Sequence, residues 1–153
     1  MIGVKDDDTR KAVSLIENGA DVNAHDLNGL SVANWATEWP CNSIDILDLL
    51  FKHGAHFDCI EPEGKTLLID LVETYCELFQ WQKLGLQQNK KLRSRFLEDR
   101  TPAMLWLLDH GANINQKDTS GHSALDYASS ADSSLRNFLL RHAKKSKFPS
   151  FDH

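Results

Sequence analysis

One phrase occurs three times in this 153-residue chain, and it constrains the fold more than any other feature. The copies are GADVNAHDLNG at 19–29, GAHFDCIEPEG at 54–64 and GANINQKDTSG at 111–121. The second copy begins 35 residues after the first, and the third begins 57 residues after the second. Such repetition indicates a chain built from similar units that stack on one another.

An apolar run with helical spacing precedes each copy. The runs are TRKAVSLIENG, IDILDLLFKHG and PAMLWLLDHG, with apolar residues three and four positions apart. This spacing predicts a helix with one buried stripe. Gly19, Gly54 and Gly111 then predict the helix ends, because glycine adopts the left-handed conformation after a helix without a Cβ penalty.

Each copy is followed by a residue that can begin another helix. Ser31, Thr66 and Ser123 stand two residues after the closing glycines, and serine and threonine are favoured N-caps. Each unit therefore has the predicted order turn, helix, turn, helix and extended tip. One such unit cannot cover its own apolar face, whereas a stack of units can.

This pattern resembles the ankyrin repeat, a unit of about 33 residues. The segments DLNGLSVANWA at 26–36 and DTSGHSALDYA at 118–128 stand where the family has its D-x-x-G-x-T-P-L-H-x-A opening. The segment EPEGKTLLIDL at 61–71 is a weaker copy. The resemblance implies an all-α ankyrin-repeat solenoid of about three full repeats plus a truncated N-terminal unit, with an extended helical insertion in the middle repeat.

The chain departs from the family's opening in two ways. The family's proline is replaced by Val32, Leu67 and Ala124, and its histidine by Asn34, Ile69 and Asp126. The loss of the histidine predicts weaker hydrogen bonds holding the tips together. We expect a single domain over residues 1–143, with the insertion at about 74–100, and a flexible C-terminal tail over 144–153.

The insertion has a helical pattern of its own. Apolar residues from Leu67 to Phe79 continue one face, which predicts a helix to about Trp81 or beyond, ended by Gly85. The segment NKKLRSRFLED at 89–99 predicts a separate short helix. Thr101 and Pro102 then suit the N-cap and first residue of the next helix.

The insertion is also more basic than the rest of the chain, whose formal net charge is −5. Lys90, Lys91, Arg93 and Arg95 form a candidate basic patch. One interpretation is a solvated helix face. The other is a surface for an acidic partner or for phosphates, with nucleic acid as one possible ligand.

The resemblance implies that a partner contacts the tips and the first helices. The candidate partner-binding residues are His25, Leu27, Asn28, Leu30, Glu38, Trp39, Glu63, Lys65, Lys117, Thr119 and His122. Leu27 and Leu30 stand out because turn positions are normally polar. Trp39 is a candidate aromatic anchor beside them. The alternative is that these side chains fold back onto the truncated first unit. We expect Trp35, Trp81 and Trp106 to be buried.

The sequence lacks recognisable catalytic chemistry. His53, His56, Cys41 and Cys59 lie near one another in sequence, but their spacing matches no four-ligand zinc signature. Neither a phosphate-binding glycine loop nor a nucleophile motif occurs. We therefore expect no catalytic residue, no metal and no cofactor, and no enzymatic activity.

The remaining features suggest a compartment and a function. Three cysteines, no apolar leader and no long apolar run predict a cytoplasmic protein. Delivery into a host cell by a route that reads no signal peptide stays open. We expect a protein–protein interaction module whose partner is another protein rather than a membrane or nucleic acid, and which is monomeric alone. The alternatives are a small stoichiometric inhibitor of the immunity or antitoxin type, and a pathogen's ankyrin effector acting on host proteins.

Overall fold

The computed structural model describes residues 3–37, 43–57, 62–84, 90–131 and 133–143, with backbone alone for 3–8, 62, 82, 90–99 and 131. Within these ranges it is helical, with no strand beyond two isolated bridges, and this confirms the all-α class for that part of the chain. None of these helices is long and apolar enough to cross a membrane. The helices are α1 (Gly3–Glu17), α2 (Val32–Thr37), α3 (Ile44–Lys52), α4 (Leu67–Lys83), α5 (Lys90–Asp109), α6 (Ala124–Ala131) and α7 (Ser133–Ala143), with a 3-10 turn, η1 (Pro62–Gly64), before α4.

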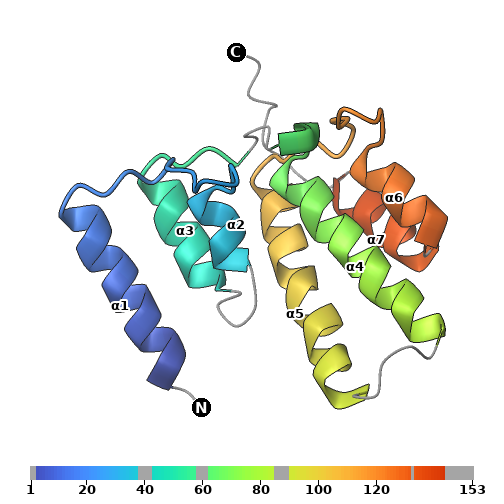
Figure 1. Ribbon diagram of the computed structural model, residues 1–153, viewed down its shortest axis with the longest axis horizontal. Coiled ribbons are helices and arrows are strands. Elements are labelled where there is room, and N and C mark those ends of the chain that lie inside the picture. The colour runs from blue at the N-terminus through green and yellow to red at the C-terminus, as the bar shows by residue number, and fades with distance from the viewer. Residues whose placement is uncertain (1–2, 38–42, 58–61, 85–89, 132, 144–153) are drawn as a thin grey trace.

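The helices pack as hairpins side by side (Figure 1). The pairs α2–α3, α4–α5 and α6–α7 each pack together, and α1, α3, α5 and α7 contact one another in chain order. On the other side of the hairpins, α4 packs against α6. The segments between hairpins lie at the same end of the helices, and we call them tip 1 (19–31), tip 2 (54–57 and 62–66) and tip 3 (111–123).

The helices that lead into the tips end at the expected glycines. In tip 1, Gly19 has a φ of 86°, and the backbone N–H of Ala20 donates to the Leu15 carbonyl at 3.0 Å. Gly54 and Gly111 have the same conformation, and the alanines after them make the equivalent bond. This bond satisfies a carbonyl that the last helical turn leaves free, so each helix stops without losing a hydrogen bond.

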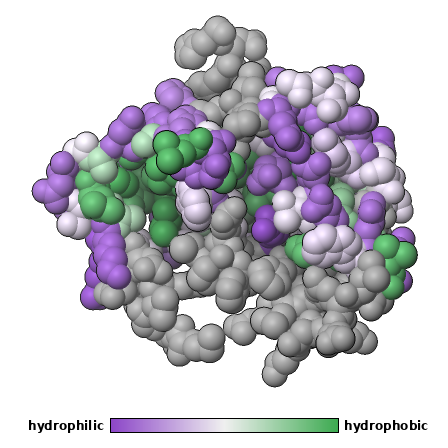
Figure 2. All heavy atoms as spheres, viewed as in Figure 1, coloured by the Kyte–Doolittle hydropathy of each residue, from purple (hydrophilic) through white to green (hydrophobic). Residues whose placement is uncertain are grey.

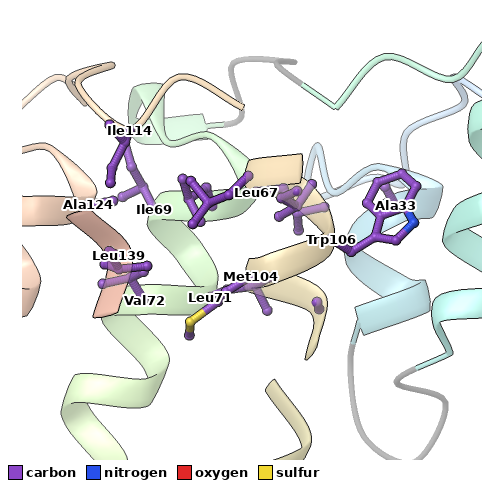
Figure 3. Close-up of a cluster of buried hydrophobic side chains, with 14 of the residues drawn as sticks. Ala33, Leu67, Ile69, Leu71, Val72, Met104, Trp106, Ile114, Ala124 and Leu139 are labelled. Carbon is purple, nitrogen blue, oxygen red and sulfur yellow. The ribbon is translucent and has the colours of Figure 1, made fainter. Parts of the chain in front are cut away.

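The buried core is centred on α4 (Figure 3). The fully buried α4 side chains are Leu67, Leu68, Ile69, Leu71 and Val72. They belong to one cluster with Met104 of α5, Ala124 of α6 and Leu139 of α7. Burying each leucine contributes about 2 kcal/mol, and α4 can bury them only because the neighbouring hairpins cover it.

The α4–α5 hairpin contains the insertion. α4 reaches Lys83, which confirms that it extends past Trp81, while Gly85 lies outside the described residues. Trp81 itself is 45% exposed, so the expectation that it is buried is wrong. It lies in the last turn of α4.

The expected break between a short helix and a new helix at Thr101 is also wrong. α5 is continuous and contains Pro102 in its interior. An interior proline costs about 3 kcal/mol, because it removes one hydrogen bond and crowds the carbonyl four residues before it. α5 packs against α3, α4 and α7, and these contacts offset that cost.

An aromatic cluster of Phe51, Phe57, Trp106 and His110 joins α3 to α5. Trp106 is 7% exposed, which confirms its predicted burial, and its Nε1–H donates to Asp48 Oδ1 of α3 at 2.5 Å. His110 stacks on the indole at a centroid distance of 3.8 Å, and Phe51 and Phe57 contact it in T-shaped geometry at 5.8 and 4.9 Å. The hydrogen bond to the Asp48 carboxylate, the stacking of the rings and the burial of Trp106 therefore all hold α3 against α5.

Candidate functional site

An aspartate shapes tip 1. The Asp26 carboxylate accepts the backbone N–H groups of Asn28 at 2.8 Å and of Leu30 at 2.9 Å, and the Asp26 N–H donates to the Leu30 carbonyl at 2.9 Å. The bond from Leu30 is the largest of the effects that lower the pKa of Asp26. The Asn28 side chain also hydrogen-bonds Asp26, whereas no such bond comes from the side chain of Leu27, so the shape of the turn does not depend on the Leu27 side chain.

Tip 3 repeats this arrangement 92 residues later in the chain. The Asp118 carboxylate accepts the N–H groups of Ser120 and His122, both at 2.9 Å, and Asp118 N–H donates to the His122 carbonyl at 3.0 Å. Burial acts to raise the pKa of Asp118, but hydrogen bonds from Tyr127, His122 and Ser120 outweigh it and lower the pKa. The two turns therefore have the same construction.

An aromatic donor stands nine residues after each of these aspartates. Tyr127 Oη donates to Asp118 Oδ2 at 2.6 Å, and this bond is the main cause that raises the pKa of Tyr127 to about 12. A hydrogen bond from the Trp35 side chain contributes to the lowered pKa of Asp26. Trp35 is 52% exposed, so its predicted burial is wrong. Its indole lies at the surface beside tip 1 instead of in the core.

The residues at the position of the ankyrin repeat's histidine lie at the starts of α2, α4 and α6, the helices that follow the tips. Ser123 Oγ accepts the N–H of Asp126 at 3.3 Å, and Asp126 Oδ2 accepts the N–H and Oγ–H of Ser123 at 2.8 and 2.7 Å. This is a capping box with aspartate in the third position. Thr66 makes only the first half, by accepting the N–H of Ile69 at 3.3 Å.

Asn34 makes an incomplete version of the same box. Ser31 Oγ accepts the N–H of Asn34 at 3.3 Å, and the Ser31 hydroxyl donates to Asn34 Oδ1. The Asn34 side chain is buried, and its Nδ2 has no hydrogen-bond partner among the residues that the structure describes. Tip 1 thus leads into a helix start that is less well satisfied than the start of α6.

Tip 3 is tied to tip 2. The Glu63 carbonyl accepts the backbone N–H of Thr119 at 3.0 Å and its hydroxyl at 2.7 Å. Glu63 has a φ of 75°, a strained value for a residue with a side chain. Gly64 beside it also has a positive φ, and a Cβ there would lie 2.8 Å from the Thr119 nitrogen. Close approach of the two tips therefore requires glycine at position 64.

Lys65 stabilises the same corner. Its ammonium lies 2.8 Å from a Glu63 carboxylate oxygen and 2.7 Å from one of Glu73 on α4. Burial acts to lower the pKa of Lys65, but these two carboxylates outweigh it and raise the pKa. The Lys65 side chain is 20% exposed, and its ion pairs join tip 2 to α4.

Tip 1 is tied to tip 2 by a different residue. The Asn23 side chain accepts the N–H of His56 at 2.8 Å and donates to the Gly54 carbonyl at 3.3 Å. The two bonds join units that are more than 30 residues apart in sequence. An amide is suited to this role because it both donates and accepts.

The predicted partner-binding residues differ in how exposed they are and in whether the structure describes them. The exposed ones are His25, Leu27, Asn28, Glu63, Lys117, Thr119 and His122, whereas Leu30 and Lys65 are partly buried. Thr119 and Glu63 join two tips, which the sequence did not indicate. Glu38 and Trp39 lie outside the described residues. The basic patch of Lys90, Lys91, Arg93 and Arg95 lies on α5, but its side chains are not described.

Exposed apolar side chains gather on the N-terminal half of the molecule. Leu27 is fully exposed, Leu15 at the end of α1 is 63% exposed, and Trp35 is half exposed. On the face shown in Figure 2, hydrophobic residues lie over the side of α1, α2 and tip 1, while the side of α4 and α6 is mostly hydrophilic. Tip 1 and α2 are thus the part of this face best suited to an apolar contact.

Sequence reasoning missed Trp35, although a signal for it existed. Asp26 and Trp35 have the same nine-residue spacing as Asp118 and Tyr127, and both aromatic residues carry a hydrogen-bond donor. In the described part of the chain, no group of three or more His, Cys, Asp or Glu side chains could hold a metal ion.

No protein-family model matches the sequence, and no similar curated protein was found by comparison.

Proposed function

We propose that this chain is a protein-binding module of the ankyrin-repeat type, and that its partner contacts tip 1 and the exposed face of α2. The fold part of the proposal is supported by the repeated helix ends, the equivalent turns at Asp26 and Asp118, and the contacts that α1, α3, α5 and α7 make in chain order. The function part is supported by the surface of tip 1.

One observation carries the function. Leu27 and Trp35 are exposed large apolar side chains, and Asp26 holds the turn that carries Leu27 and accepts a hydrogen bond from the Trp35 side chain. A side chain held before binding loses little conformational freedom on binding. Burial of a leucine contributes about 2 kcal/mol, and tryptophan is among the residues that most often dominate binding energy.

The proposed mode of action is occupation of a partner's surface. The partner would cover Leu27 and Trp35 and leave tips 2 and 3, which Thr119 and Lys65 tie together, as the rigid support. Binding by such a frame masks a surface, bridges two partners or competes with a third. Each of these outcomes follows from contact alone and needs no chemical step.

The test is affinity capture from cells that express the protein, followed by mass spectrometry. The variant carries Leu27→Asp and Trp35→Ala, and the matched control carries Leu84→Asp and Trp81→Ala, which change exposed residues just after α4 and near its C-terminal end. Circular dichroism and denaturant unfolding are measured first, to check that both variants are folded. We expect a partner that the wild type and the control retain and that the tip 1 variant loses. Equal recovery with all three proteins would refute a contact through tip 1.

A further inference from the structure

Tip 1 and tip 3 are the two ends of the row of tips. Each carries hydrogen-bonding groups of the kind that join neighbouring tips inside the molecule. Asn115 stands four residues after the opening glycine of tip 3, as Asn23 does in tip 1. Asn23 bonds the next tip through Gly54 and His56. The Asn115 side chain is exposed, and among the described residues its amide has no partner. The C-terminal end therefore presents an unused joining group.

The N-terminal end presents the groups that such an asparagine binds. The Gly19 carbonyl and the Asp21 N–H occupy the positions in tip 1 that the Gly54 carbonyl and the His56 N–H occupy in tip 2. Neither makes a hydrogen bond within the described part of the chain. A side-chain amide placed like Asn115 matches both, because it supplies one donor and one acceptor.

A second pair of unused groups matches in the same way. Leu27 stands in tip 1 where Thr119 stands in tip 3, and Thr119 donates its N–H to the Glu63 carbonyl of the tip before it. The N–H of Leu27 has no partner among the described residues, and its side chain is fully exposed. Ser120 stands in tip 3 where Glu63 stands in tip 2, so its carbonyl is the corresponding acceptor.

We propose that tip 3 of one copy of this chain docks against tip 1 of a second copy, in the way that neighbouring tips join inside the molecule. A second copy is the occupant because the chain carries both halves of the contact, with two matching sets of donors and acceptors.

The contact is heterologous, because different surfaces of the two copies meet. Such contacts form open chains or closed rings and do not stop at a symmetric dimer. The contact covers Leu27 and leaves Trp35 open. Self-association therefore competes with the partner proposed above, although neither proposal depends on the other. It also differs from the monomer that the sequence led us to expect.

The first test is sedimentation velocity over a hundredfold range of protein concentration. We expect the wild type to associate reversibly as concentration rises. Asn115→Ala removes two hydrogen bonds at the C-terminal end, and Leu27→Asp places a carboxylate in the contact at the N-terminal end, so each should weaken association about tenfold or more. Leu84→Asp makes the same change at an exposed leucine just after α4 and should associate like the wild type.

Mixing the two variants tests the geometry. The Asn115→Ala protein keeps an intact N-terminal end, and the Leu27→Asp protein keeps an intact C-terminal end. Each alone should be monomeric at a concentration where their equimolar mixture forms a one-to-one dimer and nothing larger. A symmetric dimer through one shared surface would give no such complementation.

A photo-crosslinking residue at position 27 then locates the contact. Crosslinks to residues 111–123 of a second copy support the proposal. A wild type that stays monomeric at every concentration overturns it, as does association unchanged in both variants, or crosslinks that fall elsewhere. In each of those cases the capture experiment with the variant that carries Leu27→Asp and Trp35→Ala can still support the proposed function, so the two failures are distinguishable.

Discussion

The junction between the α2–α3 and α4–α5 hairpins and the junction between the α4–α5 and α6–α7 hairpins are held by different means. At the first junction, α3 meets α5 through the aromatic cluster, and Asn23 joins the tips. At the second, α4 packs along α6 and Thr119 joins the tips. Within the described residues, α2 packs mainly against α3 and makes no comparable contact with α4.

The difference follows from two features of the sequence. α2 has six residues, so it offers α4 less than two turns of surface, whereas α4 and α6 are longer. Pro62 also stands in tip 2 at the position of Thr119 in tip 3. A proline has no N–H, so tip 2 cannot make to tip 1 the backbone bond that tip 3 makes to tip 2. Units with one pattern can thus be joined in unequal ways.

The largest expected effect separates the two junctions. Trp106→Ala removes the centre of the aromatic cluster and should cost about 4 kcal/mol. Hydrogen exchange should show loss of protection in α1–α3 while α4–α7 stay protected. Leu139→Ala at the second junction is the counterpart and should expose α6 and α7 first. Uniform loss of protection in both variants would mean that the junctions do not differ in this way.

Gly64→Ala should have the next largest effect and act on the second junction. The new Cβ meets the Thr119 nitrogen at 2.8 Å and the backbone has a positive φ, so we expect a loss of about 3 kcal/mol in the free energy of unfolding. Gly121→Ala is the control, because it has a similar φ and open space, and it should cost about 1 kcal/mol. Equal losses in denaturant titrations would show that tips 2 and 3 are not closely packed.

Tyr127→Phe should lower the free energy of unfolding by about 1.5 kcal/mol at neutral pH, because it removes a hydrogen bond to a carboxylate. The folded state lowers the pKa of Asp118 below 3.8, so this contribution is present above that pH and is lost as pH falls through the folded pKa. The pKa of Tyr127 is raised from 10.0 to about 12, so the contribution is also lost as pH rises through about 12. Unfolding measured from pH 2 to 12 should therefore show the two proteins differing most in the middle of the range. A constant difference would contradict the role of Asp118.

The smallest effect compares two asparagines at the same position of different tips. Asn23→Ala should cost about 1 kcal/mol, because it breaks the bonds to His56 and Gly54. Asn115→Ala should leave the stability of the dilute monomer unchanged, since its amide has no partner in the described part of the chain. Thermal unfolding at low protein concentration measures both. Similar losses for the two variants would indicate a partner for Asn115.

Local features were predictable from the sequence, and contacts between units were not. The helix ends at Gly19, Gly54 and Gly111 follow from backbone conformation, which depends on one residue type. The continuity of α5 through Pro102 was not predictable, because packing by three other helices outweighs a local penalty. The bonds from Asn23 and Thr119 were missed because they join distant residues whose approach only the folded chain defines.

Within the candidate site, the sequence predicted the exposure of a turn residue such as Leu27, but not the bonds that other candidate residues make within the chain. Leu27 is exposed, as its place in a turn indicated, whereas the bonds that the partner candidates Thr119 and Lys65 make to neighbouring groups of the chain were not predicted. Trp35 was assigned to the core because large aromatic residues are usually buried. A hydrogen bond from its side chain contributes to the lowered pKa of Asp26, so the exposed indole has a polar partner at the surface.

The construction of tip 1 has a consequence for how its specificity can change. Asp26 holds the turn through the main chain and the Asn28 side chain, so position 27 is free to carry other side chains without disturbing the frame. A library of substitutions at position 27 would alter what the loop recognises while its scaffold stays the same, as in an antibody loop carried on a constant framework.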